Sequence, residues 1–295
     1  MGSANARGYN AAEDLLARNA GRPEKIAYID DAGAYTYREL GRRVNRFASA
    51  LQRLGVQPEQ RILIAMLDTI DWPVAFLGAI KAGAVPVAAN TLLTSADYRY
   101  MIEDSRARLL FVSDALLPAF SGVPNVIAGK AGFEHFMRNG EERFEAARTT
   151  CDDACFWLYS SGSTGVPKGT VHVQSSPLLT AELYARPVLG LREDDLVFSA
   201  AKLFFAYGLG NALSFPLAVG ATTLLMSERP TPAAVFKRLG RASVFYGVPT
   251  LYAALLADGN LPPAPKLRIC TSAGEALRKA SARRRRWWAA SPPAA

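Results

Sequence analysis

The segment Tyr159–His172 reads YSSGSTGVPKGTVH and continues the apolar run FWLY at positions 156–159. The apolar run predicts a buried strand, and the change to glycine and hydroxyl residues predicts a loop at its carboxyl end. Gly162 and Gly165 allow the backbone to turn its N–H groups inward, and the hydroxyl groups and the lysine add donors and positive charge. These candidate phosphate ligands are Ser160, Ser161, Gly162, Ser163, Thr164, Gly165 and Lys168. Ligands of open α/β sheets bind at the carboxyl ends of strands, where this loop lies. Its donors and positive charge suit a nucleoside triphosphate.

The spacing excludes one common phosphate loop. A Walker loop requires Gly-Lys-Ser/Thr after four spacers from its first glycine. Here the four residues after Gly162 are followed by Pro167-Lys168-Gly169, so the pattern fails at two positions. A flexible Gly/Ser turn on the surface is the alternative, and composition alone leaves both interpretations open.

Strand and helix patterns alternate on both sides of the loop. We expect strands at 25–29, 61–67, 84–88, 109–112, 156–159, 196–199, 221–226, 243–248 and 267–271. We expect helices at 10–19, 37–54, 71–82, 95–103, 232–239 and 249–257, and a surface helix at 141–148. Thr36 and Glu39 fit a capping box, and Ser95 is the expected cap of its helix. The alternation predicts an α/β fold of layered, mostly parallel sheets with flanking helices.

The formal net charge of +8 raises the possibility of a nucleic-acid binder. Six of the 34 basic residues lie after Leu277, and the remaining 28 face 26 acidic residues. A body so close to neutral has no broad basic footprint, so we expect no nucleic-acid partner. The alternative is a binder of acidic surfaces that acts through the cluster at 283–286.

Cysteine usage and hydropathy indicate a cytoplasmic protein. The three cysteines cannot all pair, and no apolar leader precedes them, which indicates a reducing compartment. Cys151 and Cys155 are either ordinary thiols or half of a metal site for which the histidines offer no second half. The 25 residues 203–227 carry no charge. We read them as a buried helix, a turn at 218–220 and a strand, rather than a membrane span.

Several ordered motifs then identify a family. SSGSTGVPKG resembles the phosphate loop of the AMP-forming adenylating superfamily, which includes acyl-CoA synthetases, luciferases and peptide-synthetase adenylation domains. TYRELGRRVNRFASALQRLGV and WPVAFLGAIKAGAVPVAANTLL resemble its N-terminal region, and TSAGEAL resembles its adenine-side motif. KLFFAYGLGNALSFPLAVGATTLL is similar to the aromatic segment of benzoate-CoA ligases. The resemblance covers about residues 9–277, which we expect to form a partial N-terminal adenylation domain.

The resemblance implies an enzyme that activates a benzoate-like acid through acyl-AMP to its coenzyme A thioester. Its small-molecule partners would be the acid, ATP with Mg²⁺, and coenzyme A. By the family pattern Lys168 and Thr164 are catalytic, and the loop binds the phosphates. Ala273, Gly274 and Glu275 would contact adenine, and Phe205, Ala206 and Tyr207 would line the acyl pocket. Without the resemblance, Phe204, Phe205 and Tyr207 would be read as core residues.

The sequence departs from the family pattern after Leu277. The family continues with a glutamate that helps to hold magnesium, a ribose-binding aspartate and a small C-terminal domain with a catalytic lysine. Residues 278–295 instead read RKASARRRRWWAASPPAA, so we expect a frameshifted or disordered tail, no metal ligand and no small domain in this chain. The alternatives are a genuine basic tail, a non-catalytic remnant that binds ATP weakly, and a ligase for another carboxylic acid. Neither oligomeric state nor membrane association is indicated.

Overall fold

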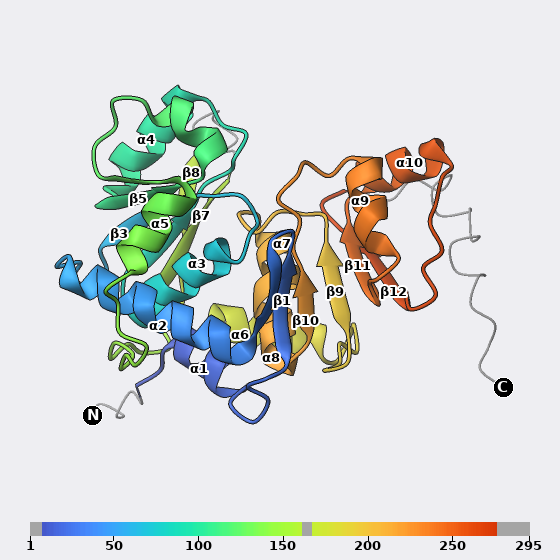
Figure 1. Ribbon diagram of the computed structural model, residues 1–295, viewed down its shortest axis with the longest axis horizontal. Coiled ribbons are helices and arrows are strands. Elements are labelled where there is room, and N and C mark those ends of the chain that lie inside the picture. Colours follow the sequence, from blue (N-terminus) through green and yellow to red (C-terminus); the bar gives the residue numbers. More distant parts are fainter. Residues whose placement is uncertain (1–7, 161–166, 276–295) are drawn as a thin grey trace, which may run out of the picture.

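The computed structural model describes residues 8–160 and 167–275 and arranges them around two six-stranded sheets (Figure 1). The strand orders are β12-β11-β9-β10-β1-β2 and β6-β5-β3-β4-β7-β8. All neighbouring strands are parallel except β1 with β2 and β7 with β8, which are antiparallel pairs at one edge of each sheet. The expected α/β class with layered, mostly parallel sheets is confirmed.

The second sheet has helices on both faces. Its strands are β3 (Arg61–Ala65), β4 (Val85–Ala88), β5 (Leu109–Val112), β6 (Val126–Ala128), β7 (Ala154–Ser160) and β8 (Lys168–Val173). Its helices are α2 (Tyr37–Arg53), α3 (Asp71–Lys81), α4 (Ser95–Ser105), η1 (Asp114–Phe120) and α5 (Gly129–Met137). Ile62 and Ile64 of β3 face the core that contains α2, α3 and α5, whereas Leu63 and Ala65 face α4. Burial on both faces explains why the strand sequences are continuous apolar runs.

The first sheet also separates two layers of helices. Its strands are β1 (Ile26–Asp30), β2 (Gly33–Thr36), β9 (Leu196–Ser199), β10 (Thr222–Leu224), β11 (Val244–Gly247) and β12 (Ile269–Ser272). The remaining helices are α1 (Ala11–Ala17), α6 (Ser176–Thr180), η2 (Ala181–Ala185), α7 (Ala206–Leu209), η3 (Gly210–Ser214), α8 (Phe215–Val219), α9 (Pro232–Leu239) and α10 (Pro249–Asp258). The side chains of Phe198 and Phe245 pack with α9 and α10. Those of Val197 and Tyr246 join the core between the two sheets.

The uncharged stretch at 203–227 is buried within this fold. It forms α7, η3 and α8, turns at Gly220 with φ 82°, and continues as β10. The expected helix, turn and strand are therefore confirmed. Within the described residues, none of the helices has both the length and the apolar character that crossing a membrane requires.

Two local expectations are wrong. Residues 141–148 form no helix, because tertiary contacts hold them against other elements. The side chain of Asn45 donates to the backbone oxygen of Glu142, and the N–H of Ala147 donates to the backbone oxygen of Lys81. The cap of α4 is Thr94 rather than Ser95, since the Thr94 hydroxyl accepts from the third residue of the helix. The capping box at Thr36 is present as expected.

Candidate active site

The predicted phosphate loop joins two arms of an antiparallel hairpin. β7 leads into the loop and β8 returns from it, with Ser160 and Lys168 as register partners at its mouth. β7 runs parallel to β4, so Ser160 lies at a carboxyl end of the parallel part of the sheet, as the sequence predicted. Ser161, Gly162, Ser163, Thr164 and Gly165 lie outside the described residues. The return strand β8 was not predicted from sequence.

Helix α4 contacts this hairpin near the end of β7 and just before β8. The hydroxyl of Tyr159 donates to Asp104 Oδ2 at 2.5 Å, and burial together with this carboxylate raises the pKa of Tyr159. The hydroxyl of Tyr100 donates to the backbone oxygen of Pro167 at 3.0 Å. Gly169 lies under the rings of Trp157 and Tyr159, where an added Cβ would approach Trp157 to 2.9 Å. The mouth of the loop is thus fixed by contacts from outside the loop itself.

The aromatic segment lies before and within α7. Phe205 is 49% exposed, and its ring contacts that of buried Phe204 at a centroid distance of 4.5 Å. Ala206 is exposed, and Tyr207 is half-buried with its pKa raised by that burial. Two of the three predicted acyl-pocket residues, Phe205 and Ala206, are therefore exposed rather than part of the core. The π-helical turn η3 follows at once, and such turns are frequent at functional sites.

A tyrosine joins this segment to the predicted adenine-side residues. The hydroxyls of Tyr207 and Thr271 are 2.7 Å apart, and the hydroxyl of Tyr252 donates to the backbone oxygen of Thr271 at 2.8 Å. Ala273, Gly274 and Glu275 follow directly at the carboxyl end of β12, and Gly274 has a φ of 94°. Sequence analysis missed Thr271 and Tyr252. Thr271 begins the quoted TSAGEAL motif, but its role depends on a contact across 64 positions.

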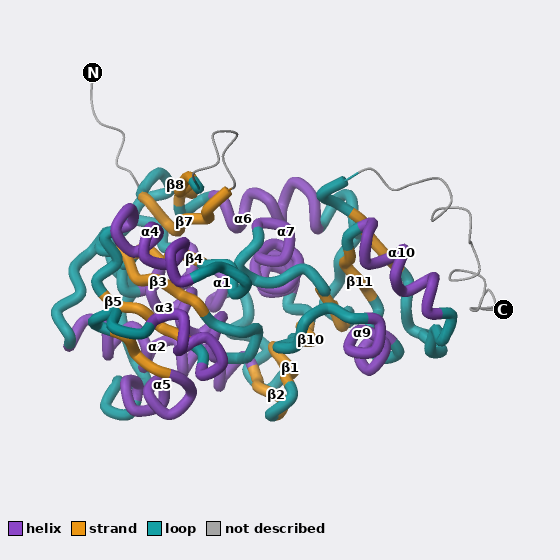
Figure 2. Tube along the Cα trace, turned by 90° about the horizontal axis from the view of Figure 1, so that it is seen from above, coloured by secondary structure: helices purple, strands orange, loops and turns teal. Residues whose placement is uncertain are grey.

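A cavity of about 140 Å³ lies between the β7–β8 hairpin and the aromatic segment. Figure 2 shows β7 and β8 on the same side of the molecule as α6 and α7, which border it. It is lined by Phe76, Phe156, Leu158, His172, Ser176, Pro177, Thr180, Ala206, Leu209, Gly210, Leu213, Ser214 and Phe215. His172 stacks on Phe156 at 4.5 Å, and burial lowers the pKa of this histidine. Ala206 lines the cavity, whereas Phe205 and Tyr207 do not.

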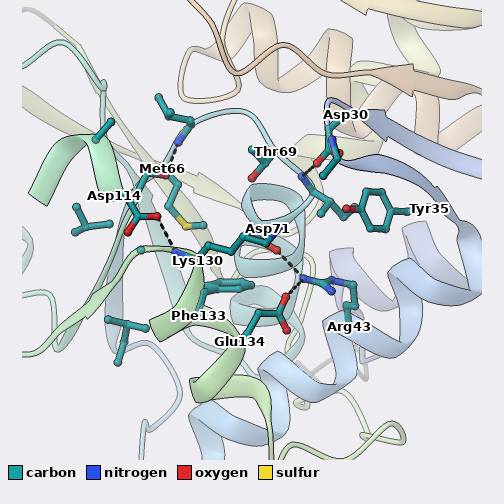
Figure 3. Close-up of a pocket in the computed structure, with 18 residues that line it drawn as sticks. Asp30, Tyr35, Arg43, Met66, Thr69, Asp71, Asp114, Lys130, Phe133 and Glu134 are labelled. Atoms are coloured by element: carbon teal, nitrogen blue, oxygen red, sulfur yellow. Dashed lines mark hydrogen bonds and ion pairs between the residues drawn. The ribbon is translucent and has the colours of Figure 1, made fainter.

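A larger cavity of about 420 Å³ lies elsewhere, beside the ends of β3 and β5 (Figure 3). Arg43 of α2 contacts Asp71 of α3 at 2.6 Å and Glu134 of α5 at 2.8 Å. Burial raises the pKa of Asp71 in spite of Arg43. Four carboxylates and two cationic side chains line this cavity. Its negative balance repels a triphosphate, and none of the predicted site residues reaches it.

Two of the cysteines precede residues of the candidate site, since Cys155 comes before Phe156 and Cys270 before Thr271. Cys151 is exposed and Cys155 is buried, and burial raises the pKa of Cys155. Burial also raises the pKa of Cys270 to about 11. In residues 8–160 and 167–275, no three His, Cys, Asp or Glu side chains gather as a metal site.

Comparison with known proteins places these features in a family. The profile described as AMP-binding enzyme matches residues 15–292. The chain belongs to this family. Two curated relatives are especially similar. The benzoate–CoA ligase of Thauera aromatica is 62% identical over 287 residues, covering 91% of this chain and 54% of that protein. The 4-hydroxybenzoate–CoA/benzoate–CoA ligase of Rhodopseudomonas palustris is 47% identical, with 92% and 54% covered.

Solved structures agree with this assignment. A benzoate CoA ligase from Burkholderia xenovorans LB400 matches with a TM-score of 0.87 and 54% identity, covering 92% of this chain and 57% of that one. The anthranilate CoA ligase AuaEII, solved in complex with anthranoyl-AMP, matches with a TM-score of 0.89 and 37% identity, covering 93% and 56%. The chain spans about half the length of the curated relatives it matches.

Proposed function

We propose that this chain supplies the adenylating domain, about residues 9–277, of an AMP-forming ligase that converts a benzoate-like acid to its coenzyme A thioester. The observation that supports it most is the apolar cavity between the β7–β8 hairpin, which contributes Phe156 and His172, and the segment that contains Ala206. An apolar cavity suits a ring, and the proposed phosphate loop connects the two strands of the same hairpin. Because it uses ATP and coenzyme A, the protein acts in the cytoplasm.

In the first half-reaction, a carboxylate oxygen of the acid attacks the α-phosphorus of ATP. A new O–P bond forms, the bond to the bridging oxygen breaks, and pyrophosphate leaves. Lys168 and Thr164 stabilise the charge that develops on pyrophosphate, with Ser160, Ser161 and Ser163 as further donors. This catalysis consists of positioning and electrostatic stabilisation. ATP enters as its magnesium complex, which supplies additional neutralising charge.

The nucleotide would bind beside Thr271, and the acid would bind beside Tyr207, at the other end of the contact between these two residues. Ala273, Gly274 and Glu275 would contact adenine from the end of β12. The ring of the acid would enter the 140 Å³ cavity past Ala206. An apolar protein cavity of about 150 Å³ holds a benzene molecule, so the volume suits a single ring. In the second half-reaction, the coenzyme A thiol attacks the acyl carbon and AMP leaves.

A chimera tests the proposal. Residues 8–275 would replace the matching segment of the Thauera aromatica benzoate–CoA ligase, and ATP–pyrophosphate exchange and thioester formation would be measured with a panel of acids. We expect exchange that depends on benzoate. A folded chimera without exchange would support the remnant interpretation, and preference for another acid would reassign the substrate. The same assay on the chain alone would show how much of the reaction it performs by itself.

Ala206→Leu tests the acyl site directly. Because Ala206 is exposed, the larger side chain is accommodated by the fold yet narrows the cavity entrance. We expect benzoate affinity to fall at least about tenfold, or roughly 1.4 kcal/mol, with an unchanged unfolding midpoint. Ala206→Gly is the control and should retain binding. Unchanged affinity in Ala206→Leu would remove the ring from this cavity.

A further inference from the structure

Asp68 and Lys202 form a buried ion pair that joins the two sheets. Asp68 follows β3 of one sheet, and Lys202 lies between β9 of the other sheet and α7. Lys202 Nζ is 3.9 Å from Asp68 Oδ2, and the side chains are only 13% and 6% exposed. Two buried charges at this distance are costly to desolvate, so the pair is weak evidence for stability. A role in fixing the geometry of its surroundings accounts for it better.

The side-chain ammonium and the backbone oxygen of Lys202 are both hydrogen-bonded. Its ammonium donates to the backbone oxygen of Met226 and, at 2.6 Å, to that of Glu228. Its own backbone oxygen accepts from the N–H of Phe205 at 3.0 Å. Gly208 packs so closely on this carbonyl that an added Cβ would lie 2.0 Å from the oxygen. The aromatic segment therefore begins at a residue whose side chain and backbone are both held.

Asp68 reaches the same segment through a second route. Its two carboxylate oxygens lie 3.4 and 3.3 Å from the backbone N–H of Leu203, which donates to them. The carboxylate thus contacts the ammonium of Lys202 and the amide of the next residue, across 135 positions of sequence. Residues 203–209 contain Ala206, which lines the cavity, and Tyr207, which contacts Thr271.

We propose that Asp68 and Lys202 are positioning residues that hold residues 203–209 of the first sheet's helical layer at a fixed place relative to β3 and the β7–β8 hairpin of the second sheet. The link to acid binding rests on the function proposed above. The positioning itself concerns only contacts of this chain and is measured without substrate.

The charges around the Asp68–Lys202 pair make its contribution to stability depend on pH. Burial raises the pKa of Asp68 to about 7, against the opposing effects of Lys202 and the Leu203 amide. Burial lowers the pKa of Lys202, which also faces the charges of Arg238, Glu228 and Asp31. Between its ordinary range and pH 7, Asp68 binds more protons in the folded than in the unfolded state. Its contribution to stability therefore falls as pH rises through this window, while its attraction for Lys202 grows.

Hydrogen exchange of amides 203–209 tests the proposal on the chain as it exists. We compare protection factors between pH 6 and 8 in the wild type, Asp68→Asn, Lys202→Met and Lys237→Met. Lys237 is the matched control, because its ammonium also pairs with Glu228, at 3.7 Å, but on the exposed surface. Because an opening that exposes Asp68 lets its carboxyl release a proton more easily, we expect protection of the wild-type segment to fall at least about threefold from pH 6 to 8. Asp68→Asn should lose that fall, Lys202→Met should lower protection of the segment at pH 8 below that of the wild type, and Lys237→Met should match the wild type.

Wild-type protection that stays constant or rises with pH would overturn the proposal, and this arm needs no variant to fold. Unchanged protection in both folded variants would overturn it as well. Benzoate titration then tests the link to function, with affinity expected to fall three- to tenfold in both variants and to stay unchanged in Lys237→Met. If exchange responds as expected but the wild type binds no benzoate, the positioning stands and the proposed function of this chain fails.

Discussion

The two edge hairpins are built on the same plan but end differently. Each sheet closes one edge with an antiparallel pair, β1–β2 or β7–β8, and Figure 2 shows the two pairs on opposite sides of the molecule. In β1–β2 only Asp31 and Ala32 separate the strands. Asp30 Oδ1 accepts from the N–H groups of Ala32 at 2.8 Å and Gly33 at 3.1 Å. The turn therefore satisfies its own donors.

The β7–β8 hairpin is held from outside instead. Seven residues, 161–167, separate its strands, and α4 anchors Tyr159 of β7 and Pro167, the residue before β8. A short turn closed by its own aspartate has no donors to offer a ligand, whereas a longer glycine- and hydroxyl-rich connection has many. Turn length and the source of the anchoring therefore distinguish the hairpin of the proposed phosphate loop from the β1–β2 hairpin.

The largest effect should come from Lys168 at the mouth of the β7–β8 hairpin. Lys168→Ala removes the positive charge that we propose stabilises the departing pyrophosphate. We expect benzoate-dependent ATP–pyrophosphate exchange in the chimera to slow by about one to three orders of magnitude, or roughly 1.4–4 kcal/mol. Lys168 is exposed, so the unfolding midpoint should not change. Lys266→Ala, at another exposed lysine, is the control, and an unchanged rate in Lys168→Ala would remove this residue from the mechanism.

Replacing Asp30 should lower stability while leaving the exchange activity unchanged, the reverse of the effect expected at Lys168. Asp30→Ala leaves the Ala32 and Gly33 amides without their acceptor, and also the N–H of Ile70 that precedes α3. We expect a loss of about 1–3 kcal/mol in the free energy of unfolding, measured by denaturant titration. Exchange at saturating substrate should be retained. Asp30→Asn should recover part of the loss, and a stable Asp30→Ala would mean that the turn does not depend on its aspartate.

The smallest effects compare one glycine in each hairpin. Gly169→Ala pushes a Cβ into the Trp157 ring at 2.9 Å, so we expect a loss of about 1–3 kcal/mol, at the lower end if the ring shifts. Gly33 has no atom within 4 Å of an added Cβ, so Gly33→Ala should change stability by less than about 0.5 kcal/mol. Parallel denaturant titrations measure both. Equal effects would mean that the packing beneath the β7–β8 mouth is not tighter than that at the β1–β2 turn.

Elements with strong local signals were predicted well. The strands at 109–112 and 196–199 and the helix at 232–239 have the expected bounds, because apolar runs and a proline at the start of a helix act locally. Helix α5 was missed, since Gly129 opens it with a φ of 63° and its N-terminus is held by Asp114 from another element. The helix expected at 141–148 fails for the same kind of reason. Contacts with α2 and α3 outweigh its helix propensity.

In the candidate site, too, the sequence predicted local features but not long-range contacts. Motifs placed Ser160 directly after a strand and Lys168 in the loop that follows, and marked Phe205, Ala206 and Tyr207 as one acyl-pocket segment. They gave no sign that Tyr207 meets Thr271, that α4 anchors the hairpin, or that Asp68 meets Lys202. Each of these contacts joins residues that are far apart in sequence, and neither partner carries a local pattern that names the other.

By itself, the sequence determined the α/β class, the strand-to-loop transition at Ser160 and the family of AMP-binding enzymes. These depend on hydropathy period, turn chemistry and contiguous motifs, which act within about one element. The tertiary structure alone decided that β8 returns beside β7, that an apolar cavity lies between this hairpin and Ala206, and that a buried ion pair joins the sheets. Pairing, cavities and buried charges depend on which distant surfaces meet, and only the folded chain brings those surfaces together.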